Sequence, residues 1–88
     1  MPLEKFYILQ DTVKLMTSED YKERFKAEYY QLKIRYESLR RMIVNWEMGE
    51  LNFKPTCPKS TYDLQLRAMK DYLAVLEARA FMEGIELN

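Results

Sequence analysis

The residues able to act as nucleophiles, bases or metal ligands are few in this chain. Cys57 is its one cysteine, and the sequence contains no histidine. A thiol nucleophile needs a neighbouring base, most often histidine, and one cysteine supplies neither a disulfide within the chain nor a closed zinc site. Carboxylate pairs such as Glu19 and Glu23 form no convincing acid–base set. We therefore predict no catalytic residue, no metal and no cofactor, and we interpret Cys57 as a small buried or capping residue beside Pro58.

Aromatic and cationic residues on either side of a break between two helical patterns suggest a different chemistry. Tyr7 precedes this break, Tyr21 follows it, and four cations lie close by in the sequence: Lys14, Lys22, Arg24 and Lys26. A ring beside ammonium groups suits a nucleobase that stacks on the ring while a cation holds its phosphate. The alternative is an ordinary solvated face, in which the cations pair with glutamates such as Glu19 and Glu23. Periodicity alone leaves both interpretations open.

Three helices are predicted to position these residues. The first spans residues 1–16, with Pro2 in its first turn, where a missing N–H has no cost. A helix this short is marginal in water on its own. Its apolar residues are spaced by three and four and therefore share one face: Phe6, Leu9, Val13 and Met16.

The second predicted helix is long and spans residues 18–47. We expect Thr17 to cap it, with Asp20 placed to complete a weak capping box, and Gly49 to end it in the left-handed conformation. Arg40 and Arg41 lie near its end, where they complement the helix dipole. The apolar residues step by four and three, which is typical of a heptad seam: Phe25, Tyr29, Leu32, Tyr36, Leu39, Ile43 and Trp46.

The third predicted helix spans residues 58–83 and nearly matches the second in length. Pro58 suits its first turn, with Thr56 or Cys57 as the cap, and Gly84 followed by Ile85 is the pattern of a Schellman motif. The same steps of four and three give a second seam: Tyr62, Leu66, Met69, Leu73, Leu76 and Ala80. Two matched helices with a short link predict an antiparallel hairpin. We expect two apolar connector residues to pack against its end: Leu51 and Phe53.

The predicted fold is therefore all-α, with a short N-terminal helix followed by a long antiparallel helical hairpin in one domain of residues 1–88. A chain of this size buries a small fraction of its surface, and it has neither a disulfide nor a zinc site to compensate. Association is the source of stability that remains, so we expect a homo-oligomer. The two seams alone would fit a dimer, a tetramer or a hexamer.

Composition argues against several classes of function. Lys and Arg number 14 and so do Asp and Glu, which gives a formal net charge of zero. Binding to DNA or RNA polymers needs a basic excess, so we predict neither. No apolar run approaches the roughly 18 residues that cross a bilayer, and the N-terminus lacks the layout of a signal peptide. An unpaired cysteine without an export signal favours a reducing cytoplasm.

The sequence also resembles a known family. Three features carry the resemblance: the string DYKERFKAEYYQLK, the helix start at Cys57-Pro58, and the string QLRAMKDYLAVLEARAFMEGIEL. They are similar to the helical-hairpin domain of the phage anti-CBASS cyclic-nucleotide sponges, which anti-Thoeris sponges share. The resemblance implies a homohexamer in the cytoplasm of the infected bacterial host. It also implies that cyclic dinucleotides such as cGAMP are bound without being cleaved, so that the CBASS effector is not activated.

The resemblance further implies where the ligand binds. In that family the cyclic dinucleotide lies between the N-terminal parts of two protomers. An aromatic residue of the short first helix stacks on a base, and a lysine early in the long helix contacts phosphate. These roles fall here on Tyr7, with Phe6 as the alternative, and on Lys22, with Lys26 one turn later to replace or assist it. Two further candidates are Tyr21 and Lys14.

A second hypothesis needs no nucleotide. The chain would then be a helical adaptor that binds a host or phage protein through an exposed helix face. In that case the end of the long helix that carries Arg40 and Arg41 matters more than its start, together with Met-rich surfaces that adapt to a partner.

Overall fold

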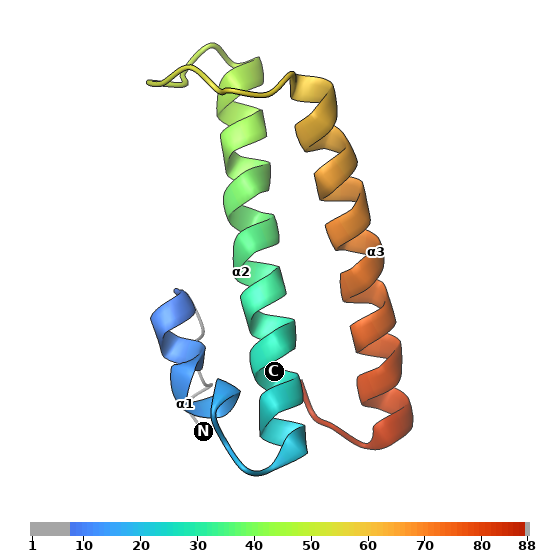
Figure 1. Cartoon of the computed structure of the whole chain (residues 1–88). Coiled ribbons are helices and arrows are strands. Elements are labelled where there is room, and N and C mark those ends of the chain that lie inside the picture. The colour runs from blue at the N-terminus through green and yellow to red at the C-terminus, as the bar shows by residue number, and fades with distance from the viewer. Residues whose placement is uncertain (1–7, 88) are drawn as a thin grey trace.

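The computed structural model describes residues 8–87 of the chain, and helices are the only regular elements in this part. A 3₁₀ turn, η1 (Leu9–Thr12), leads directly into α1 (Val13–Met16), and the long helices α2 (Tyr21–Glu47) and α3 (Lys59–Glu83) follow. Figure 1 shows α2 and α3 side by side and antiparallel, with α1 against the first half of α2 on the side away from α3. The predicted all-α hairpin with a short helix before it is confirmed. No helix of residues 8–87 combines the length and hydropathy needed to cross a membrane.

The start of α2 differs from the prediction. The helix begins at Tyr21 rather than at residue 18, and Asp20 is its cap, because the Asp20 carboxylate accepts a hydrogen bond of 2.9 Å from the Lys22 N–H. Thr17 was wrongly predicted to be this cap. Its hydroxyl instead donates to the Val13 carbonyl, 3.1 Å away, and so closes α1. An aspartate is the stronger cap here because its charge also complements the positive end of the helix dipole.

The hairpin core lies where the first half of α2 meets the second half of α3. Tyr29 and Tyr30 pack edge to face, with their ring centroids 5.2 Å apart. The predicted seams are confirmed in this region, because residues from both lines meet in one buried cluster. Its members are Phe25, Tyr29, Tyr30, Leu76, Ala80 and Ile85, with Leu32, Leu73 and Leu87 packed against them.

Polar contacts tie the two long helices together at the connector end. The Lys59 ammonium lies 2.9 Å from the Glu47 carboxylate and 3.1 Å from that of Asp63. Trp46 and Tyr62 pack edge to face beside it, with ring centroids 6.1 Å apart. Exposed ion pairs contribute little free energy singly. Of the two, the pair with Glu47 joins α3 to α2, and the pair with Asp63 lies within α3; we call Glu47, Lys59 and Asp63 the connector clamp.

Both long helices end at glycine, as predicted. Gly49 and Gly84 have φ angles of 73° and 70°, the left-handed region that glycine adopts without a Cβ clash. After Gly84, the Ile85 N–H donates to the Ala80 carbonyl over 2.8 Å, and the Ile85 side chain is buried. These two features complete the predicted Schellman motif.

The connector and the start of α3 correct three expectations. Pro58 is itself the cap of α3 rather than a first-turn residue, since its backbone is extended and the helix begins at Lys59. Cys57 is exposed and not buried. Phe53 was predicted to pack against the hairpin end but is exposed, whereas Leu51 is partly buried. The backbone bends at Asn52 and Phe53, so the two apolar side chains do not point the same way.

The short N-terminal segment also buries a different face from the predicted one. Val13 and Met16 are exposed, while Leu9 and Leu15 are partly buried and Thr12 is fully buried. The reason is that the segment starts as a 3₁₀ turn, in which side chains three residues apart align. The buried face therefore steps by three instead of by four and three.

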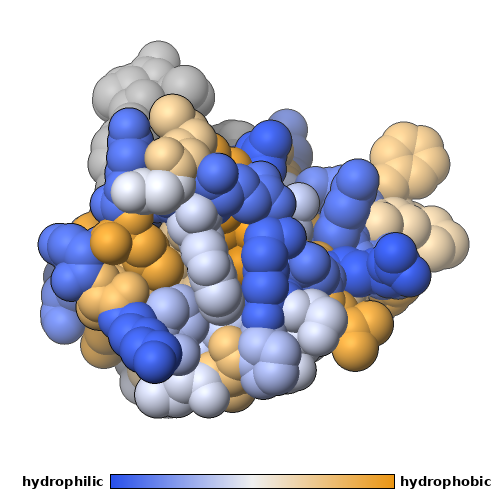
Figure 2. Space-filling model, turned by 90° about the horizontal axis from the view of Figure 1, so that it is seen from above, coloured by the Kyte–Doolittle hydropathy of each residue, from blue (hydrophilic) through white to orange (hydrophobic). Residues whose placement is uncertain are grey.

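Apolar side chains occupy both sides of α3. Besides the residues in the core, four large ones are more than half exposed: Leu64 (65%), Val75 (56%), Phe81 (88%) and Met82 (73%). Figure 2, a view from the connector end, shows apolar side chains projecting from the surface on the α3 side of the molecule. No other element of residues 8–87 packs against this second apolar face of α3.

Candidate functional site

The first two turns of α2 present two predicted ligand-binding lysines on one face. Lys22 is exposed and Lys26, one turn later, is partly buried. Residues four apart on a helix lie above one another, so the two ammonium groups can reach the same ligand. Within residues 8–87, neither side chain takes part in an ion pair or hydrogen bond. Their positive charges are thus not neutralised by direct contacts in the described structure.

Tyr21, a third predicted site residue, points toward the end of α3 instead. Its hydroxyl donates a hydrogen bond of 2.7 Å to Glu83, and the Arg79 guanidinium donates to the other oxygen of that carboxylate over 2.9 Å. The same guanidinium lies 4.8 Å from the centroid of the Phe25 ring. We call Tyr21, Arg79 and Glu83 the terminal clamp, because it ties the start of α2 to the end of α3.

The terminal clamp perturbs the proton affinities of its members. The hydrogen bonds from Arg79 and then Tyr21 favour the ionised carboxylate, so they lower the pKa of Glu83. The hydrogen bond to Glu83 in turn raises the pKa of the Tyr21 phenol. The Tyr21 hydroxyl is therefore committed to a neighbour, while its ring stays exposed and open to stacking.

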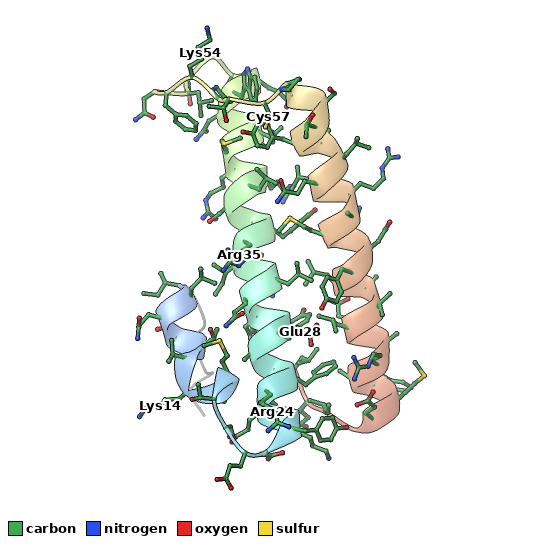
Figure 3. All side chains as sticks on the ribbon, viewed as in Figure 1. Lys14, Arg24, Glu28, Arg35, Lys54 and Cys57 are labelled. Atoms are coloured by element: carbon green, nitrogen blue, oxygen red, sulfur yellow. The ribbon has the colours of Figure 1, made fainter. Side chains whose placement is uncertain are left out.

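The remaining predicted site residues lie on the N-terminal side. Lys14 is exposed on α1 and extends away from α2 (Figure 3). It therefore does not converge with Lys22 and Lys26 within this protomer. Phe6 and Tyr7, the predicted stacking residues, lie outside the described residues.

One pair of residues that the sequence reading missed fixes the N-terminal segment to α2. The fully buried Thr12 hydroxyl donates to the Leu9 carbonyl over 2.7 Å and accepts from the Gln31 side-chain amide over 2.9 Å. Gln31 also reaches the Met16 sulfur at 3.3 Å. The apolar periodicity that located the helices carries no signal for a polar contact of this kind. In a 3₁₀ turn, Thr12 lies on the same side as Leu9, three residues earlier, and this spacing is the one sequence signal that Thr12 shares its buried face.

Arg24 holds the turn between α1 and α2. Its guanidinium donates to the Ser18 carbonyl over 2.7 Å, so the cation caps the turn rather than projecting freely. Figure 3 shows Arg24, Glu28 and Arg35 one after another along α2. They line a shallow hollow of about 290 Å³ that Met16 of α1 and Tyr72 of α3 complete. The Tyr72 hydroxyl donates to the Glu28 carboxylate in its wall.

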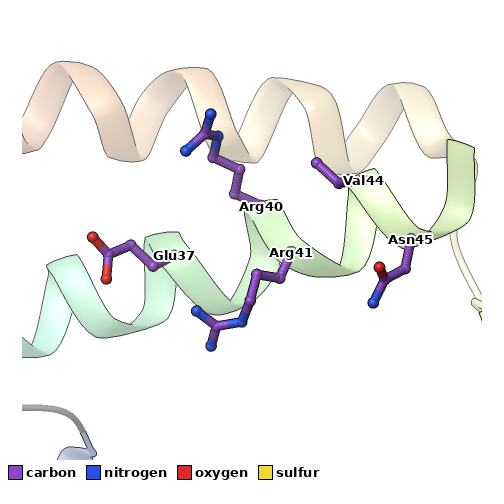
Figure 4. A pocket seen from close by; sticks show the side chains of 5 residues that line it. All are labelled: Glu37, Arg40, Arg41, Val44 and Asn45. Carbon is purple, nitrogen blue, oxygen red and sulfur yellow. The ribbon is translucent and has the colours of Figure 1, made fainter. Parts of the chain in front are cut away.

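A second hollow of about 390 Å³ lies near the other end of α2 and is lined by that helix alone. It contains the two arginines that the adaptor hypothesis emphasised. The side chains of Arg40 and Arg41 point away from each other (Figure 4), and Arg41 donates to the Ser38 hydroxyl over 3.3 Å. Two diverging guanidinium groups do not form a pocket for one small anion.

The described residues hold no group of three or more Cys, Asp or Glu side chains arranged to bind a metal ion. Cys57 lies exposed in the connector. Of the predicted site residues that the structure describes, Lys22 and Lys26 share one face, and the exposed Tyr21 ring adjoins Lys22 in sequence.

The comparisons with known proteins gave one match. A family model described as Sequestin matches residues 19–82, which include α2, the connector and nearly all of α3. No curated protein and no solved structure matches the chain.

Proposed function

The chain belongs to the Sequestin family, the phage anti-CBASS/anti-Thoeris sponge family, and on this premise we propose that it binds and sequesters cyclic oligonucleotide second messengers. Proteins of this family are sponge-type binding proteins and are not known as enzymes. The proposed ligands are cyclic dinucleotides such as cGAMP. Held without cleavage in the cytoplasm of the infected bacterium, they no longer reach the CBASS effector.

The observation that carries this proposal is the pair of lysines on one face of the first two turns of α2. Lys22 and Lys26 supply two ammonium groups to the phosphates, and neither is neutralised by a contact within residues 8–87. Tyr7, or Phe6 in its place, stacks on a base, and stacking contributes roughly 1–3 kcal/mol per base. Tyr21 adjoins Lys22 in this site, and Lys14 would reach it from a second protomer.

We further propose that the protein acts as a homo-oligomer, as a hexamer by its resemblance to the family. A ligand held between two protomers needs few residues from each, because every residue is used twice about a two-fold axis. The exposed apolar face of α3 supports self-association, since large exposed apolar patches mark interaction sites. The separation of Lys14 from Lys22 within one protomer also agrees with a site that is completed by a second chain.

Titration calorimetry with a panel of cyclic di- and trinucleotides tests the proposal. Removing a charge-assisted hydrogen bond costs about 1.5–3 kcal/mol, so Lys22→Ala should weaken binding roughly 10- to 150-fold. Lys70→Ala is the matched control, because Lys70 is an exposed lysine on α3 outside the site. The absence of binding by any nucleotide at micromolar concentration, or equal losses in the two variants, would refute the assignment.

The same samples separate a sponge from an enzyme. Nucleotide that is bound, released by heat denaturation and recovered intact supports sequestration. Recovery of linear or hydrolysed nucleotide would show catalysis and contradict the proposal.

The adaptor hypothesis remains the second candidate because the later half of α2 has an exposed face. Val44 and Met48 are exposed beside Arg40 and Arg41, and α1 does not extend that far (Figure 1). A protein partner at this face would be captured from host lysate in fixed stoichiometry. Its binding would be lost in Val44→Glu and unchanged by added cyclic nucleotides.

A further inference from the structure

The side of α3 that faces away from α2 carries a regular stripe of exposed residues. Their spacing alternates between four and three, which places them along one line of a helix. We call them the outer stripe: Leu64, Ala68, Asp71, Val75, Ala78 and Met82. All are exposed, and all but Asp71 are apolar. A helix with apolar lines on opposite sides is typical of one that lies between two partners, and α2 is only the first of these.

The spacing of the outer stripe makes its positions symmetric about Leu73, and the residue types match at two of the three symmetric pairs: two alanines, and two large apolar residues at the ends. Leu64 and Met82 are equally far from Leu73 in the sequence, and so are Ala68 and Ala78. Asp71 and Val75 form the innermost pair in the same way. In an antiparallel coiled coil, each seam residue packs opposite a residue of the other seam position in the partner helix. Two copies of α3 related by a two-fold axis at the level of Leu73 would therefore bring these pairs opposite one another.

The side chains fit this arrangement. Small alanines would meet on both sides of the centre, which lets the two helices approach closely, and the larger Leu64 and Met82 would close the ends. Asp71 is the one polar residue of the stripe, and in this register it faces Val75 of the second copy, so burial of its carboxylate opposes the packing. Arg67 lies one turn before Asp71 on the same helix, at the distance at which opposite charges attract.

The flanks of the stripe are complementary as well. In the antiparallel register, Arg67 of one copy lies alongside Phe81 of the other, and the Phe81 ring is 88% exposed in the protomer. A guanidinium over an aromatic face is a favourable cation–π contact. On the other flank, Tyr72 lies beside Tyr72 of the second copy. In this pairing, no two side chains of like charge face each other across the flanks of the stripe.

We propose that the outer stripe is a contact between copies of this chain, in which α3 packs antiparallel against α3 of a second protomer about a two-fold axis. The contact is isologous, so each pair of residues occurs twice. It rests on the self-association part of the proposed function and does not depend on the nucleotide.

Disulfide trapping tests the register directly. Ala68→Cys and Ala78→Cys are made in separate chains that also carry Cys57→Ser, and the nucleotide-free proteins are oxidised singly and as a mixture. In the proposed register the two new thiols face each other only in the mixture, whereas the same position in two copies is separated by about 15 Å along the helix. A disulfide needs Cα atoms about 4.4–6.8 Å apart. Covalent dimer should therefore form at least tenfold faster in the mixture than in either protein alone.

Sedimentation of the wild-type protein and of Ala78→Glu, without nucleotide, gives the independent measurement. A charge at the alanine layer should lower the mass of the assembly, while Lys70→Glu, off the stripe on the same helix, should not. A monomeric wild-type protein would overturn both this contact and the proposed oligomer. If the mass of the oligomer is unchanged in Ala78→Glu, or if all three oxidised samples cross-link at equal rates, the contact alone is overturned. Calorimetry reports ligand binding separately from either outcome.

Discussion

The hydrogen bond between Thr12 and Gln31 is predicted to decide whether the N-terminal segment stays on α2. Thr12→Val keeps the shape of the side chain but removes the bond to Gln31 and the bond to the Leu9 carbonyl. A typical intramolecular hydrogen bond contributes about 1 kcal/mol net, so the loss is about 2 kcal/mol. That corresponds to a roughly 30-fold increase in the equilibrium constant for opening of the segment.

Amide hydrogen exchange measures this opening residue by residue. The informative amides are those of Asp11 and Thr17, which donate to the Ile8 and Val13 carbonyls inside the segment. Their protection should fall roughly 30-fold in Thr12→Val, whereas amides in the middle of α2 should keep theirs, because the segment opens without the hairpin. Thr17→Val, measured at the Asp11 amide, is the matched control. The substitution also replaces a threonine by valine in the N-terminal segment. Thr17 is exposed, and its hydroxyl bonds only to carbonyls of that segment.

Two results would refute this reasoning. If protection of the segment is unchanged in Thr12→Val, the contact with Gln31 does not hold it. If protection falls by the same factor throughout α2 and α3, the segment is part of the global unfolding unit. Gln31→Leu combined with Thr12→Val completes a double-mutant cycle, and the two changes should be less than additive because they remove one shared bond.

Three further predictions concern the hairpin. Leu76→Ala should lower the free energy of unfolding by about 2–5 kcal/mol in urea titrations, because Leu76 is 1% exposed in the core and the change leaves a cavity; a loss below about 1 kcal/mol would mean that the core collapses around the gap. Burial, and next the hydrogen bond to Glu77, raise the pKa of Tyr29, so its stabilising contribution is present below the ordinary tyrosine pKa of about 10 and is lost as pH rises above it. Tyr29→Phe should therefore flatten the alkaline limb of a stability–pH curve, and an unchanged limb would assign that limb to other groups. The pKa of Glu83 is lowered, so its contribution is present above the ordinary glutamate pKa of about 4.3 and is lost as pH falls through the folded-state pKa. Glu83→Gln should reduce the acid sensitivity of thermal unfolding, and equal acid sensitivity in the variant would contradict that role.

The two long helices were predictable because their signals are local. The heptad steps of Phe25 and Tyr29 on α2, and of Leu76 and Ala80 on α3, follow from helix geometry alone, and these residues are buried. Gly84 marked a helix end because few other residues adopt its left-handed backbone. Local patterns of this kind are sufficient to predict the antiparallel hairpin.

Features that depend on distant or competing contacts were not predictable in this way. Thr12 is buried because a 3₁₀ turn changed the period of its segment and because Gln31 supplies a partner. Tyr21 looked like part of a cationic cluster, yet its hydroxyl bonds to Glu83 at the other end of the sequence. Thr17 and Asp20 both suit a cap, and the helix start at Tyr21 places Asp20 rather than Thr17 at the cap position. The placement of Lys22 and Lys26 on one face was predictable, since it requires nothing beyond the helix period.

The two clamps of the hairpin differ in the length of chain that each one closes. Lys59 and Glu47 are separated by little more than the connector, whereas Tyr21 and Glu83 are 62 residues apart in sequence. Loop-closure entropy grows with the logarithm of loop length, so forming the terminal clamp first would cost about 1.5 kcal/mol more than forming the connector clamp first. We therefore expect folding to start at the connector and to proceed along the helices toward the terminal clamp. The end of the hairpin beside Lys22 and Lys26, which contains the buried core, would then be the last to assemble.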